Sequence, residues 1–387
     1  MRFTYILFME VFKMKKKLLS ALLCVAMVAS LVVGCGAKEE AAAPEAPAAT
    51  EEAPAEEAAA PAEGGYHFEI VSKGFQHAFW QAVYKGAETK AAELGDTMNF
   101  VGPNSESDIA DQVQMINNAI NAQPAAIGLA ALDTNAAMDA ITQAQAAGIP
   151  IIGFDSGVPG APEGAIYANA ATDNYAAGQL AAVETFKLIG EKVKAGGVRI
   201  GVLSQDATGE SLISRGTGFI DKMAELATAE GKTVGVIGND YFVGAFAAEN
   251  AGEGADVIIE VLVPSQVTAE LSAIDAQTLL NKEDTICIYG SNSHSAEALV
   301  TADGNIGKLG TDVIGVGFDS GIAIMDAIRA EKLAGAITQA PVAMGAAVVE
   351  LLHAVASGET VSDVDTGCQW YTAANIDDPE IAQNLYE

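Results

Sequence analysis

The sequence predicts an α/β fold in which parallel strands form the sheets and helices cover both faces of each sheet. From Tyr66 onward, short apolar runs alternate with Ala-rich segments of helical spacing. A repeated strand, helix, strand order favours parallel pairing through crossover helices. About 320 residues lie in this part, and half of the whole chain is apolar, which is enough for two hydrophobic cores. We therefore expect two α/β lobes.

The predicted strands are short apolar runs that polar or turn residues bound on either side. They are residues 68–71, 125–129, 149–154, 198–203, 257–263 and 313–318. Between them, Ser105 or Ser107 is expected to cap a helix that ends before Pro124. Asp133 is expected to cap a second helix that ends at Gly148.

The helix over residues 108–121 carries one apolar stripe. Its members recur at spacings of three and four, and they are Ile109, Val113, Ile116 and Ile120. Such a stripe predicts a face that packs against a sheet, so these residues are assigned to the core.

The N-terminal segment has the features of a secretory signal. Four lysines lie between Lys13 and Lys17, and a mostly apolar run without charge extends from Leu18 to Val33. The run leads into Gly34-Cys35, which resembles a bacterial lipobox. We predict that residues 1–34 are a lipoprotein signal peptide, that Cys35 is lipidated, and that translation starts at Met14 rather than Met1. An ordinary membrane anchor is the alternative, because apolar runs of about 18 residues can span a bilayer.

Residues 35–65 consist almost entirely of Ala, Glu and Pro, which predicts an acidic, disordered linker. Removal of residues 1–34, with five basic residues and one acidic residue, changes the formal net charge from −31 to about −35. This acidity argues against nucleic acid as a partner. It is explained by solubility at a crowded surface, and it also permits docking onto basic loops of a permease.

Nothing in the sequence predicts a metal, a cofactor or a catalytic centre. The four histidines fall at no metal-ligand spacing, and Cys287 and Cys368 stand alone once Cys24 and Cys35 are set aside. Cys287 is expected to be a buried free thiol, with a Cys287–Cys368 disulfide as the alternative. Neither a phosphate loop nor a Gly-x-Ser-x-Gly elbow is present, and the neighbours Ser293 and His294 do not form a triad pattern.

One motif occurs twice. The run from Ile152 to Gly157, with the sequence Ile-Gly-Phe-Asp-Ser-Gly, reappears as Val-Gly-Phe-Asp-Ser-Gly from Val316 to Gly321. Both copies end a predicted strand, and ligands of open parallel sheets bind beyond the carboxyl ends of strands. Asp155 and Asp319 are therefore expected to face one shared cleft. Taken singly, either copy is explained by an Asx turn.

An ordered set of motifs carries a family resemblance. They are His77 to Trp80, Lys85 to Ala87, Ala146 to Asp155, Thr172 to Tyr175 with Gly178, Arg215 to Phe219, Gly290 to Asn292, Gly315 to Asp319, and Thr338-Gln339. In this order the chain resembles the sugar-binding branch of the type I periplasmic binding proteins, the family of ribose- and galactose-binding proteins. The resemblance covers nearly all of residues 66–387.

The resemblance implies two Rossmann-like lobes with parallel sheets, joined by a three-strand hinge, with the ligand between them. The crossovers are expected near Asn169 to Ala171, Gln339 to Pro341 and Asp365 to Cys368. The N-terminal lobe would then comprise residues 66–169 and 340–366, and the C-terminal lobe residues 170–339 and 367–387.

The resemblance also implies the binding residues. Phe79 and Trp80 match an aromatic pair that sandwiches the sugar with a third aromatic, here Phe318. An aromatic face suits the C–H face of a sugar ring. The polar ligands would be Asp155, Arg215, Asn292, Asp319 and Gln339, whose side chains suit hydroxyl groups that both donate and accept. The alternatives are core positions for the rings, a surface ion pair for Arg215 and a loop turn for Asn292.

The chain departs from the family pattern at three places, of which the first two, at His77 and Ser156, touch the binding site. His77 stands where ribose-binding relatives have an asparagine, so it is either a ligand contact or a helix cap. Ser156 follows Asp155 where some relatives have an arginine. The stretch from Thr233 to Gly254 is longer than is usual in the family. Ribose itself therefore cannot be carried over to this chain.

The resulting prediction is an extracytoplasmic, lipid-anchored solute-binding protein of an ABC importer. It would bind a monosaccharide as a monomer, deliver it to the transmembrane permease subunits and catalyse nothing. The alternative is a receptor for a nucleoside, a polyol or a furanosyl signal, or one that feeds a sensor kinase. A gene-regulating relative of this fold would need a helix-turn-helix where this chain has a signal peptide and an acidic linker.

Overall fold

A computed structural model describes residues 65–387. The predicted signal peptide, the lipidated Cys35 and all but the last residue of the acidic linker lie outside the described residues. In the described part, no helix combines the length and the apolar character that crossing a bilayer requires.

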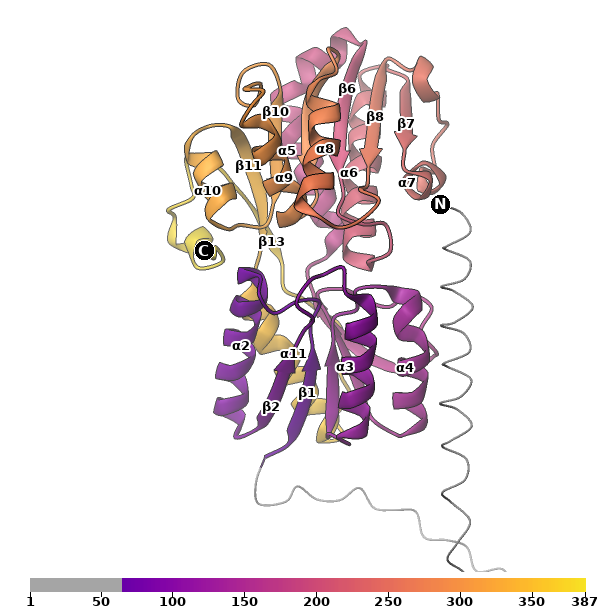
Figure 1. Cartoon of the computed structure of the whole chain (residues 1–387), viewed down its shortest axis with the longest axis vertical. Coiled ribbons are helices and arrows are strands. Elements are labelled where there is room, and N and C mark those ends of the chain that lie inside the picture. The colour runs from indigo at the N-terminus through magenta and orange to yellow at the C-terminus, as the bar shows by residue number, and fades with distance from the viewer. Residues whose placement is uncertain (1–64) are drawn as a thin grey trace, which may run out of the picture. The chain divides into compact units, whose positions relative to one another are not determined.

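The first lobe is built on a six-stranded sheet in which every pairing is parallel, with the strand order β12-β5-β4-β3-β1-β2. Its strands are β1 (His67–Val71), β2 (Thr97–Val101), β3 (Ala126–Leu129), β4 (Ile151–Phe154), β5 (Ile166–Ala171) and β12 (Val364–Asp365). Helices α2 (Ala78–Leu94) and α11 (Pro341–Ala356) share one core with this sheet, and α3 (Ile109–Asn121) and α4 (Thr134–Ala146) share the other. This six-stranded lobe is the lower half of Figure 1.

The second lobe is built on a seven-stranded sheet with the order β13-β11-β10-β9-β6-β8-β7, in which only the edge strand β13 is antiparallel. Its strands are β6 (Val198–Leu203), β7 (Val234–Gly238), β8 (Val257–Leu262), β9 (Thr285–Gly290), β10 (Ile314–Phe318), β11 (Leu333–Gln339) and β13 (Cys368–Tyr371). Helices α5 (Asn174–Ala195) and α6 (Glu210–Ala229) cover one face, and α8 (Ala269–Leu280), α9 (Ser293–Asp303) and α10 (Ile322–Arg329) cover the other.

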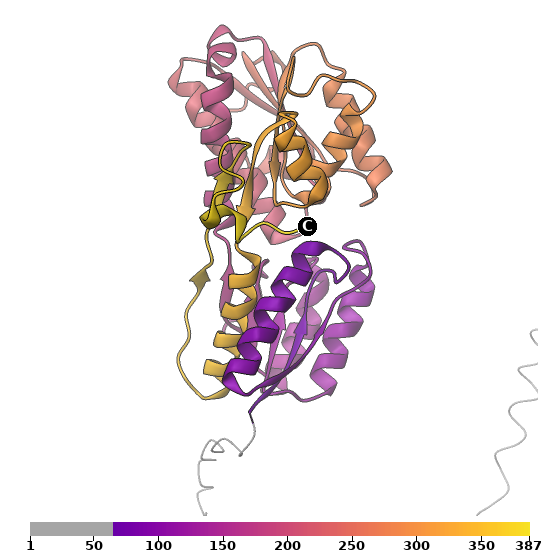
Figure 2. The same cartoon turned by 90° about the vertical axis from the view of Figure 1, so that its left-hand side faces the viewer.

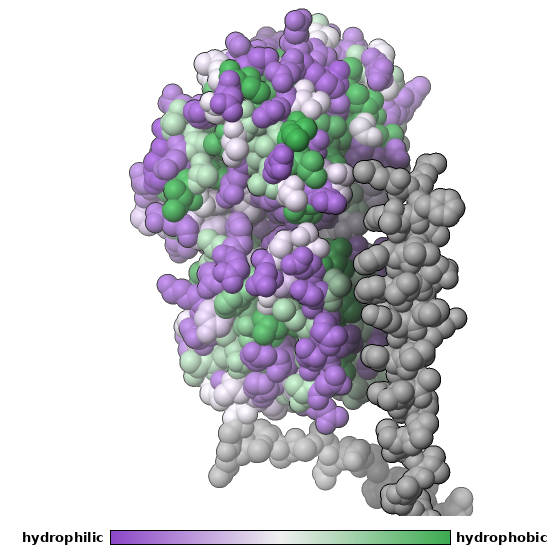
Figure 3. Space-filling view, in the orientation of Figure 1, coloured by the Kyte–Doolittle hydropathy of each residue, from purple (hydrophilic) through white to green (hydrophobic). Residues whose placement is uncertain are grey.

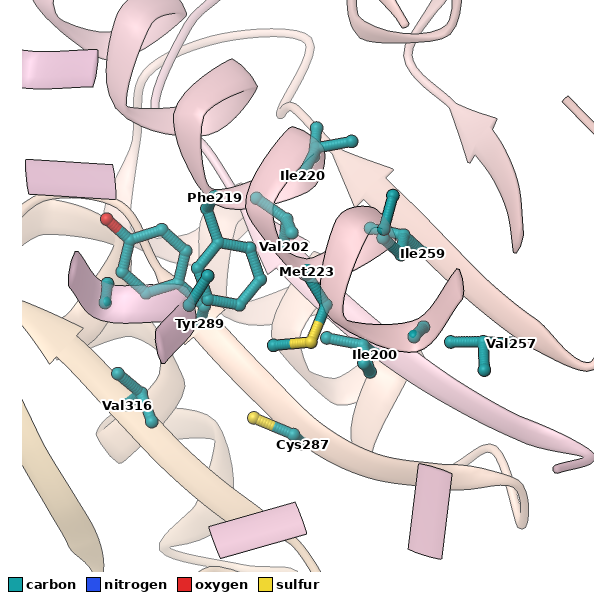
Figure 4. Packing of buried hydrophobic residues seen from close by; sticks show 14 of the residues in the cluster. Ile200, Val202, Phe219, Ile220, Met223, Val257, Ile259, Cys287, Tyr289 and Val316 are labelled. Atoms are coloured by element: carbon teal, nitrogen blue, oxygen red, sulfur yellow. The ribbon is translucent and has the colours of Figure 1, made fainter. Parts of the chain in front are cut away.

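Three short elements complete this seven-stranded lobe. They are α7 (Asp240–Ala245), the 3₁₀ helix η1 (Gly252–Gly254) and α12 (Pro379–Ala382). The first two account for the long stretch after residue 233, since β7, α7 and η1 lie together at the edge of the sheet. Figure 4 shows the core beneath α6, where Phe219 stacks on Tyr289 with ring centroids 4.4 Å apart.

The chain passes between the two sheets three times. It leaves β5 for α5, returns from β11 to α11, and leaves β12 for β13. These passages coincide with the crossovers that the family resemblance implied. Figure 2 shows the result for α11, which lies beside α2 on the six-stranded lobe although it follows a strand of the other sheet. The predicted fold class is confirmed.

The predicted helix caps are right in one case and wrong in the other. Asp133 caps α4, because its carboxylate accepts from the backbone N–H groups of Asn135 and Ala136. Helix α3 begins instead after Asp108, whose side chain makes no capping bond. Ser105 instead forms a local turn, in which its hydroxyl oxygen accepts from the N–H of Ser107. The helix therefore starts later than either serine predicts.

The buried face of α3 also differs from the predicted stripe. The buried residues are Gln112, Ile116 and Ala119, whereas Val113 is only half-buried. The amide of Gln112 donates to the carbonyls of Ser72 and Ala130 and accepts from the N–H of Leu132. A polar side chain takes a core position here because it satisfies the backbone groups that the ends of β1 and β3 leave open.

Each lobe contains one pair of helices in backbone contact. Glycines make this approach possible: a Cβ on Gly345 of α11 would collide with the carbonyl of Val83 in α2, and a Cβ on Gly178 of α5 would collide with that of Arg215 in α6. The contact between α5 and α6 fixes the backbone that carries Arg215, so packing in the lobe positions a predicted ligand residue.

Both described cysteines are free. Cys287 lies in the core of β9, and burial raises the pKa of its thiol. Cys368 is half-buried, and its pKa is raised to about 11, mainly by burial. The expectation of a buried free thiol at Cys287 is therefore correct, and the alternative disulfide is not formed.

Candidate functional site

The two copies of the repeated motif occupy equivalent places in the two sheets. Asp155 follows β4 and Asp319 follows β10, each with a positive φ, 57° and 71°. The N–H of each aspartate still bonds to the neighbouring strand, to the carbonyl of Ala170 at 3.1 Å and of Ile337 at 2.6 Å. The left-handed turn after that last sheet bond is one that aspartate tolerates well. Each of these two strands is thus followed directly by an aspartate, whose carboxylate lies at the carboxyl edge of its sheet.

One cavity lies between these two edges. It is lined from the six-stranded lobe by Lys73, His77, Phe79, Trp80, Glu106, Leu132 and Asp155, and from the other lobe by Gln205, Asp206, Ser211, Leu212, Arg215, Asn292, Ser293, Asp319 and Gln339. The structure therefore brings together eight of the nine residues proposed from the sequence. Phe318 is the exception.

Two aromatic rings from the first turn of α2 form one wall. Phe79 and Trp80 are almost fully buried, and their ring centroids lie 4.9 Å apart at an interplanar angle of 86°. His77 caps this helix, because its Nδ1 accepts from the N–H of Phe79 at 3.2 Å. The two alternatives left open for His77 are thus compatible, since the cap also lines the cavity.

Arg215 is held by fixed partners on its own lobe. Its Nε donates to Asn174 Oδ1 at 2.8 Å, and its Nη1 donates to the carbonyl of Ser291 at 3.4 Å and lies 3.9 Å from Asp319 Oδ2. The side chain is 3% exposed, so the guanidinium is already oriented before any ligand arrives. This arrangement excludes the alternative of a surface ion pair.

Phe318 does not reach the cavity surface. Its ring is fully buried in the core of the seven-stranded lobe, and the guanidinium carbon of Arg215 lies 4.0 Å from its centroid. The cation thus stands between this ring and the cavity, a favourable arrangement because the aromatic face attracts positive charge. The sequence-based prediction that Phe318 forms a third aromatic wall is not met. Leu132 and Leu212 supply the other apolar lining.

Asp319 and Gln339 form a polar pair at the seven-stranded edge. Gln339 Nε2 donates to Asp319 Oδ1 at 2.7 Å, and the N–H of Ser293 donates to Asp319 Oδ2 at 3.1 Å. Burial raises the pKa of the Asp319 carboxyl, although the charge of Arg215 opposes this. No donor among the described residues reaches the buried Oε1 of Gln339. This acceptor is therefore free for a hydroxyl group.

Asn292 combines a structural and a lining role. Its Oδ1 accepts from the N–H of Ser295 and so caps α9, while its Nδ2 donates to Gln205 Oε1 at 2.9 Å. Asn292 therefore has a local structural role, as the N-cap of α9, and it also lines the cavity.

Sequence reasoning missed six polar residues of the cavity lining, namely Lys73, Glu106, Gln205, Asp206, Ser211 and Ser293. Lys73 is 6% exposed, lies 2.8 Å from Asp155 Oδ2 and donates to Ser211 Oγ across the cavity at 2.8 Å. It comes two residues after β1, so its place at a strand's carboxyl end was a usable signal. Glu106 and Gln205 lie in irregular segments whose sequences carry no comparable signal.

Glu106 anchors the ring of Trp80. Its Oε1 accepts from Trp80 Nε1 at 2.7 Å, and its Oε2 accepts from Gln205 Nε2 of the other lobe at 3.1 Å. Burial opposes ionisation of this carboxyl, but the charge of Lys73 and the two hydrogen bonds outweigh it and lower its pKa. Glu106 is therefore an ionised link between the aromatic wall and the opposite lobe.

Direct hydrogen bonds link the two lobes at the carboxyl edges of their sheets. Besides those of Lys73 and Glu106, the N–H of Ser211 donates to Ser156 Oγ at 3.2 Å, and the N–H of Gly157 donates to Glu210 Oε2 at 3.3 Å. Ser156, the residue that departs from some relatives, therefore contacts the opposite lobe. Only about 40 Å³ of the cavity is open to the centre of a water molecule, room for a few waters. A larger solute must enter by separation of the lobes.

The described residues give little support for a metal site or for a catalytic pair of Ser293 and His294. Within residues 65–387, no group of three His, Cys, Asp or Glu side chains is arranged to hold a metal ion. His294 pairs with Ser272 at 2.8 Å rather than with the adjacent Ser293, and burial lowers its pKa. On the face drawn in Figure 3, hydrophilic and hydrophobic residues are interspersed.

Comparison with known proteins agrees with this geometry. The sequence pattern of the periplasmic binding protein domain matches residues 68–360. The chain belongs to the periplasmic binding protein family. Among members of known function, the D-apiose import binding protein of Actinobacillus succinogenes is 26% identical over 264 residues, which cover 67% of this chain and 72% of the relative.

Two solved structures are similar to most of the chain. One, from Brachyspira murdochii, is named an ABC transporter, LacI family transcriptional regulator, and is 33% identical with a TM-score of 0.69, over 84% of this chain and 99% of the other. A second is an ABC transporter solute-binding protein from Agrobacterium vitis with bound D-fucose. It is 29% identical with a TM-score of 0.68, over 83% of this chain and 100% of the other.

Proposed function

We propose that this periplasmic binding protein is the sugar receptor of an ABC importer and that it binds one monosaccharide in the cavity between its lobes. The observation that carries the proposal is the convergence of an aromatic pair and a ring of buried hydrogen-bonding side chains from both lobes on one cavity. Two similar proteins support the choice of ligand class, since one is named for D-apiose import and another holds D-fucose.

The arrangement suits a polyhydroxylated ring. Phe79 and Trp80 offer apolar surface to its C–H groups, while the carboxylates and the Gln339 carbonyl accept from hydroxyl groups. Arg215 and Lys73 donate to hydroxyl oxygens. Each charged hydrogen bond contributes about 1.5 to 3 kcal/mol, so a few of them are enough for tight binding.

Binding is proposed to drive closure of the lobes. The sugar would contact Lys73 and Asp155 on the six-stranded lobe and Arg215, Asn292 and Asp319 on the other. Because both sets reach it only in the closed form, the sugar binds that form more tightly and shifts the equilibrium toward it. No step changes a covalent bond of the sugar, so the protein acts as a receptor and not as an enzyme.

We further propose that the receptor is held outside the cell by lipid on Cys35 and passes its sugar to the permease as a monomer. The acidic linker would hold the lobes away from the membrane surface by self-repulsion. Cells grown with a labelled fatty acid are expected to incorporate the label into the parent chain and not into Cys35→Ala. A parent chain that carries no label and keeps its apolar N-terminal segment would favour an uncleaved membrane anchor.

A binding screen tests the receptor function. The full-length chain in detergent is heated with single monosaccharides, among them D-apiose, D-fucose, ribose and galactose, and with polyols and nucleosides. A compound that binds only the folded form raises the melting temperature. We expect a response to one or a few monosaccharides that is abolished in Arg215→Ala. A response confined to nucleosides or polyols would replace sugar by that ligand class.

Delivery to a permease is tested in cells. Deletion of the gene is expected to abolish uptake of the sugar found in the screen, and the unaltered gene should restore it. Undiminished uptake in the deletion strain would contradict the importer role and favour a receptor that feeds a sensor kinase.

A further inference from the structure

Helix α12 and the segment that follows it are attached to the seven-stranded lobe. Ile381 and Leu385 pack in the core that α8, α9 and α10 share with the sheet. Thr338 of β11 donates its hydroxyl proton to the carbonyl of Asn384 at 3.1 Å. Up to residue 385, therefore, this segment makes its contacts within one lobe.

The backbone of the next residue, Tyr386, is held by the repeated motif. Its N–H donates to Ser320 Oγ at 3.0 Å, and the same hydroxyl lies 3.4 Å from the Tyr386 carbonyl, to which it donates. Ser320 directly follows Asp319, one of the cavity carboxylates. The position of Tyr386 is thus tied to the turn that ends β10.

The side chain of Tyr386 contacts both lobes. Its hydroxyl oxygen accepts from the N–H of Ser320 at 3.4 Å, while its ring packs against the six-stranded lobe. It is 9% exposed and belongs to the hydrophobic core that α2 and α11 share with the six-stranded sheet. Its centroid lies 5.9 Å from that of Phe79 and 6.3 Å from that of His77, both in edge-to-face geometry. Tyr386 is absent from the cavity lining, so it stands behind the aromatic wall rather than in it.

We propose that Tyr386 is a positioning residue of the binding site, which supports Phe79 and the His77 cap from the opposite lobe when the lobes are closed. The inference rests on the proposed function. Since the backbone of Tyr386 moves with Ser320, separation of the lobes breaks the ring contacts and leaves the Ser320 bonds intact. The ring therefore stabilises the closed form without touching the sugar.

This role has a kinetic signature. A contact that exists only in the closed form slows the release of the sugar and has little effect on its entry into the open form. Edge-to-face ring pairs of this kind correspond to a factor of about 2 to 12 in an equilibrium constant. Tyr386→Ala is expected to raise the dissociation rate of the sugar about three- to tenfold and to leave its association rate nearly unchanged. Tyr386→Phe keeps the ring contacts and loses only the bond from the N–H of Ser320 to the hydroxyl, so its dissociation rate should stay closer to that of the parent than that of Tyr386→Ala.

The experiment combines two measurements on the full-length chain in detergent. Stopped-flow fluorescence of the two tryptophans, Trp80 at the cavity and Trp370 in β13, gives both rates with whichever of D-apiose, D-fucose, ribose or galactose raises the melting temperature most. Hydrogen exchange of the peptide covering residues 75–84 reports on the first turn of α2, both without sugar and at a saturating sugar concentration, where the closed form is most populated. We expect faster exchange there in Tyr386→Ala. Leu385→Ala is the matched control, because this neighbour packs only on the seven-stranded lobe and should leave that peptide unchanged.

The outcomes separate this inference from the proposed function. If a sugar binds the parent and both its dissociation rate and the α2 exchange are unchanged in Tyr386→Ala, the positioning role is wrong and the receptor function stands. If no sugar binds, the receptor function fails, and faster α2 exchange in Tyr386→Ala alone still supports contact of Tyr386 with the aromatic wall. Tyr386→Leu serves as the second variant if the alanine variant does not fold.

Discussion

At the scale of single residues, Arg215 illustrates how a proposed binding group is oriented before any ligand arrives. Its guanidinium is oriented by Asn174 and Ser291 and rests on the ring of Phe318. A lysine would keep the charge but lose the planar fork and the stacking. Its ammonium group would also lack a fixed orientation.

We predict that Arg215→Lys weakens sugar binding by about one to two orders of magnitude, which corresponds to the loss of one charged hydrogen bond. Isothermal titration of the parent and the variant measures the change. Arg329→Lys is the control, since Arg329 forms an exposed pair with Asp377 far from the cavity lining. Equal affinity of Arg215→Lys and the parent would remove Arg215 from the site.

Glu106 carries a pH-dependent contribution to stability. Its pKa lies below its usual value of 4.5, so its ionised form is favoured in the folded protein. A group of this kind stabilises the fold fully above the unfolded-state pKa and loses that contribution as the pH falls through the lower folded-state pKa. The buried Asp319, whose pKa is raised, contributes with the opposite sign.

We predict that Glu106→Gln lowers the free energy of unfolding near neutral pH and that the difference from the parent shrinks as the pH falls below about 4.5. Urea unfolding of both proteins from neutral pH to about pH 3 measures it, and the shared contribution of Asp319 cancels in the comparison. A difference that is constant over this range would show that Glu106 acts only through its shape.

At the scale of elements, α3 shows a polar residue in the place of an apolar one. Gln112 bonds to three backbone groups at the ends of β1 and β3. Its removal leaves buried backbone groups without partners, and each such group costs about 1 to 3 kcal/mol.

We therefore predict that Gln112→Ala lowers the free energy of unfolding by about 2 to 4 kcal/mol. Gln114→Ala on the exposed face of the same helix should change it by less than about 0.5 kcal/mol. Urea denaturation of the three proteins gives these values. Similar effects of the two substitutions would mean that the strand ends find other partners.

At the scale of the whole molecule, the two lobes are joined across the cavity by few but buried contacts. Lys73 is central among them, because it pairs with Asp155 and donates to Ser211 of the other lobe. Without its charge, Asp155 would remain buried without a cationic partner, which is unfavourable in the closed form.

We predict that Lys73→Met shifts the protein toward the open form and weakens sugar binding at least tenfold. Small-angle X-ray scattering at a sugar concentration that saturates the parent should give a larger radius of gyration for the variant. Lys90→Met is the control, since Lys90 pairs only with the exposed Glu93 and Glu350. An unchanged radius together with unchanged affinity would contradict the role of Lys73 in closure.

Much of the architecture was predictable from the chain alone. Six apolar runs predicted six of the strands within two or three residues at each end, and the repeated motif predicted that Asp155 and Asp319 would lie at equivalent strand ends. These predictions succeed because strand periodicity and a turn after a strand are local properties, which nearby residues determine.

The composition of the cavity was predictable only in part. Phe318 is the motif residue that was expected to form an aromatic wall. Arg215 packs over its ring, so the ring does not reach the cavity surface. Glu106 was not predicted, because its role depends on Trp80 and Gln205, which are distant in sequence. Tyr386 lies far along the chain from the helix that it supports.

The sequence by itself determined the α/β class and the places of Asp155 and Asp319 at equivalent strand ends, since these follow from the spacing of apolar residues and from a short repeated motif. The tertiary structure alone decided which side chains meet across the lobes and which are covered. The physical reason is that contacts such as Lys73 with Ser211 and Tyr386 with Phe79 depend on how two separately folded surfaces come together. No local pattern in the chain encodes that approach.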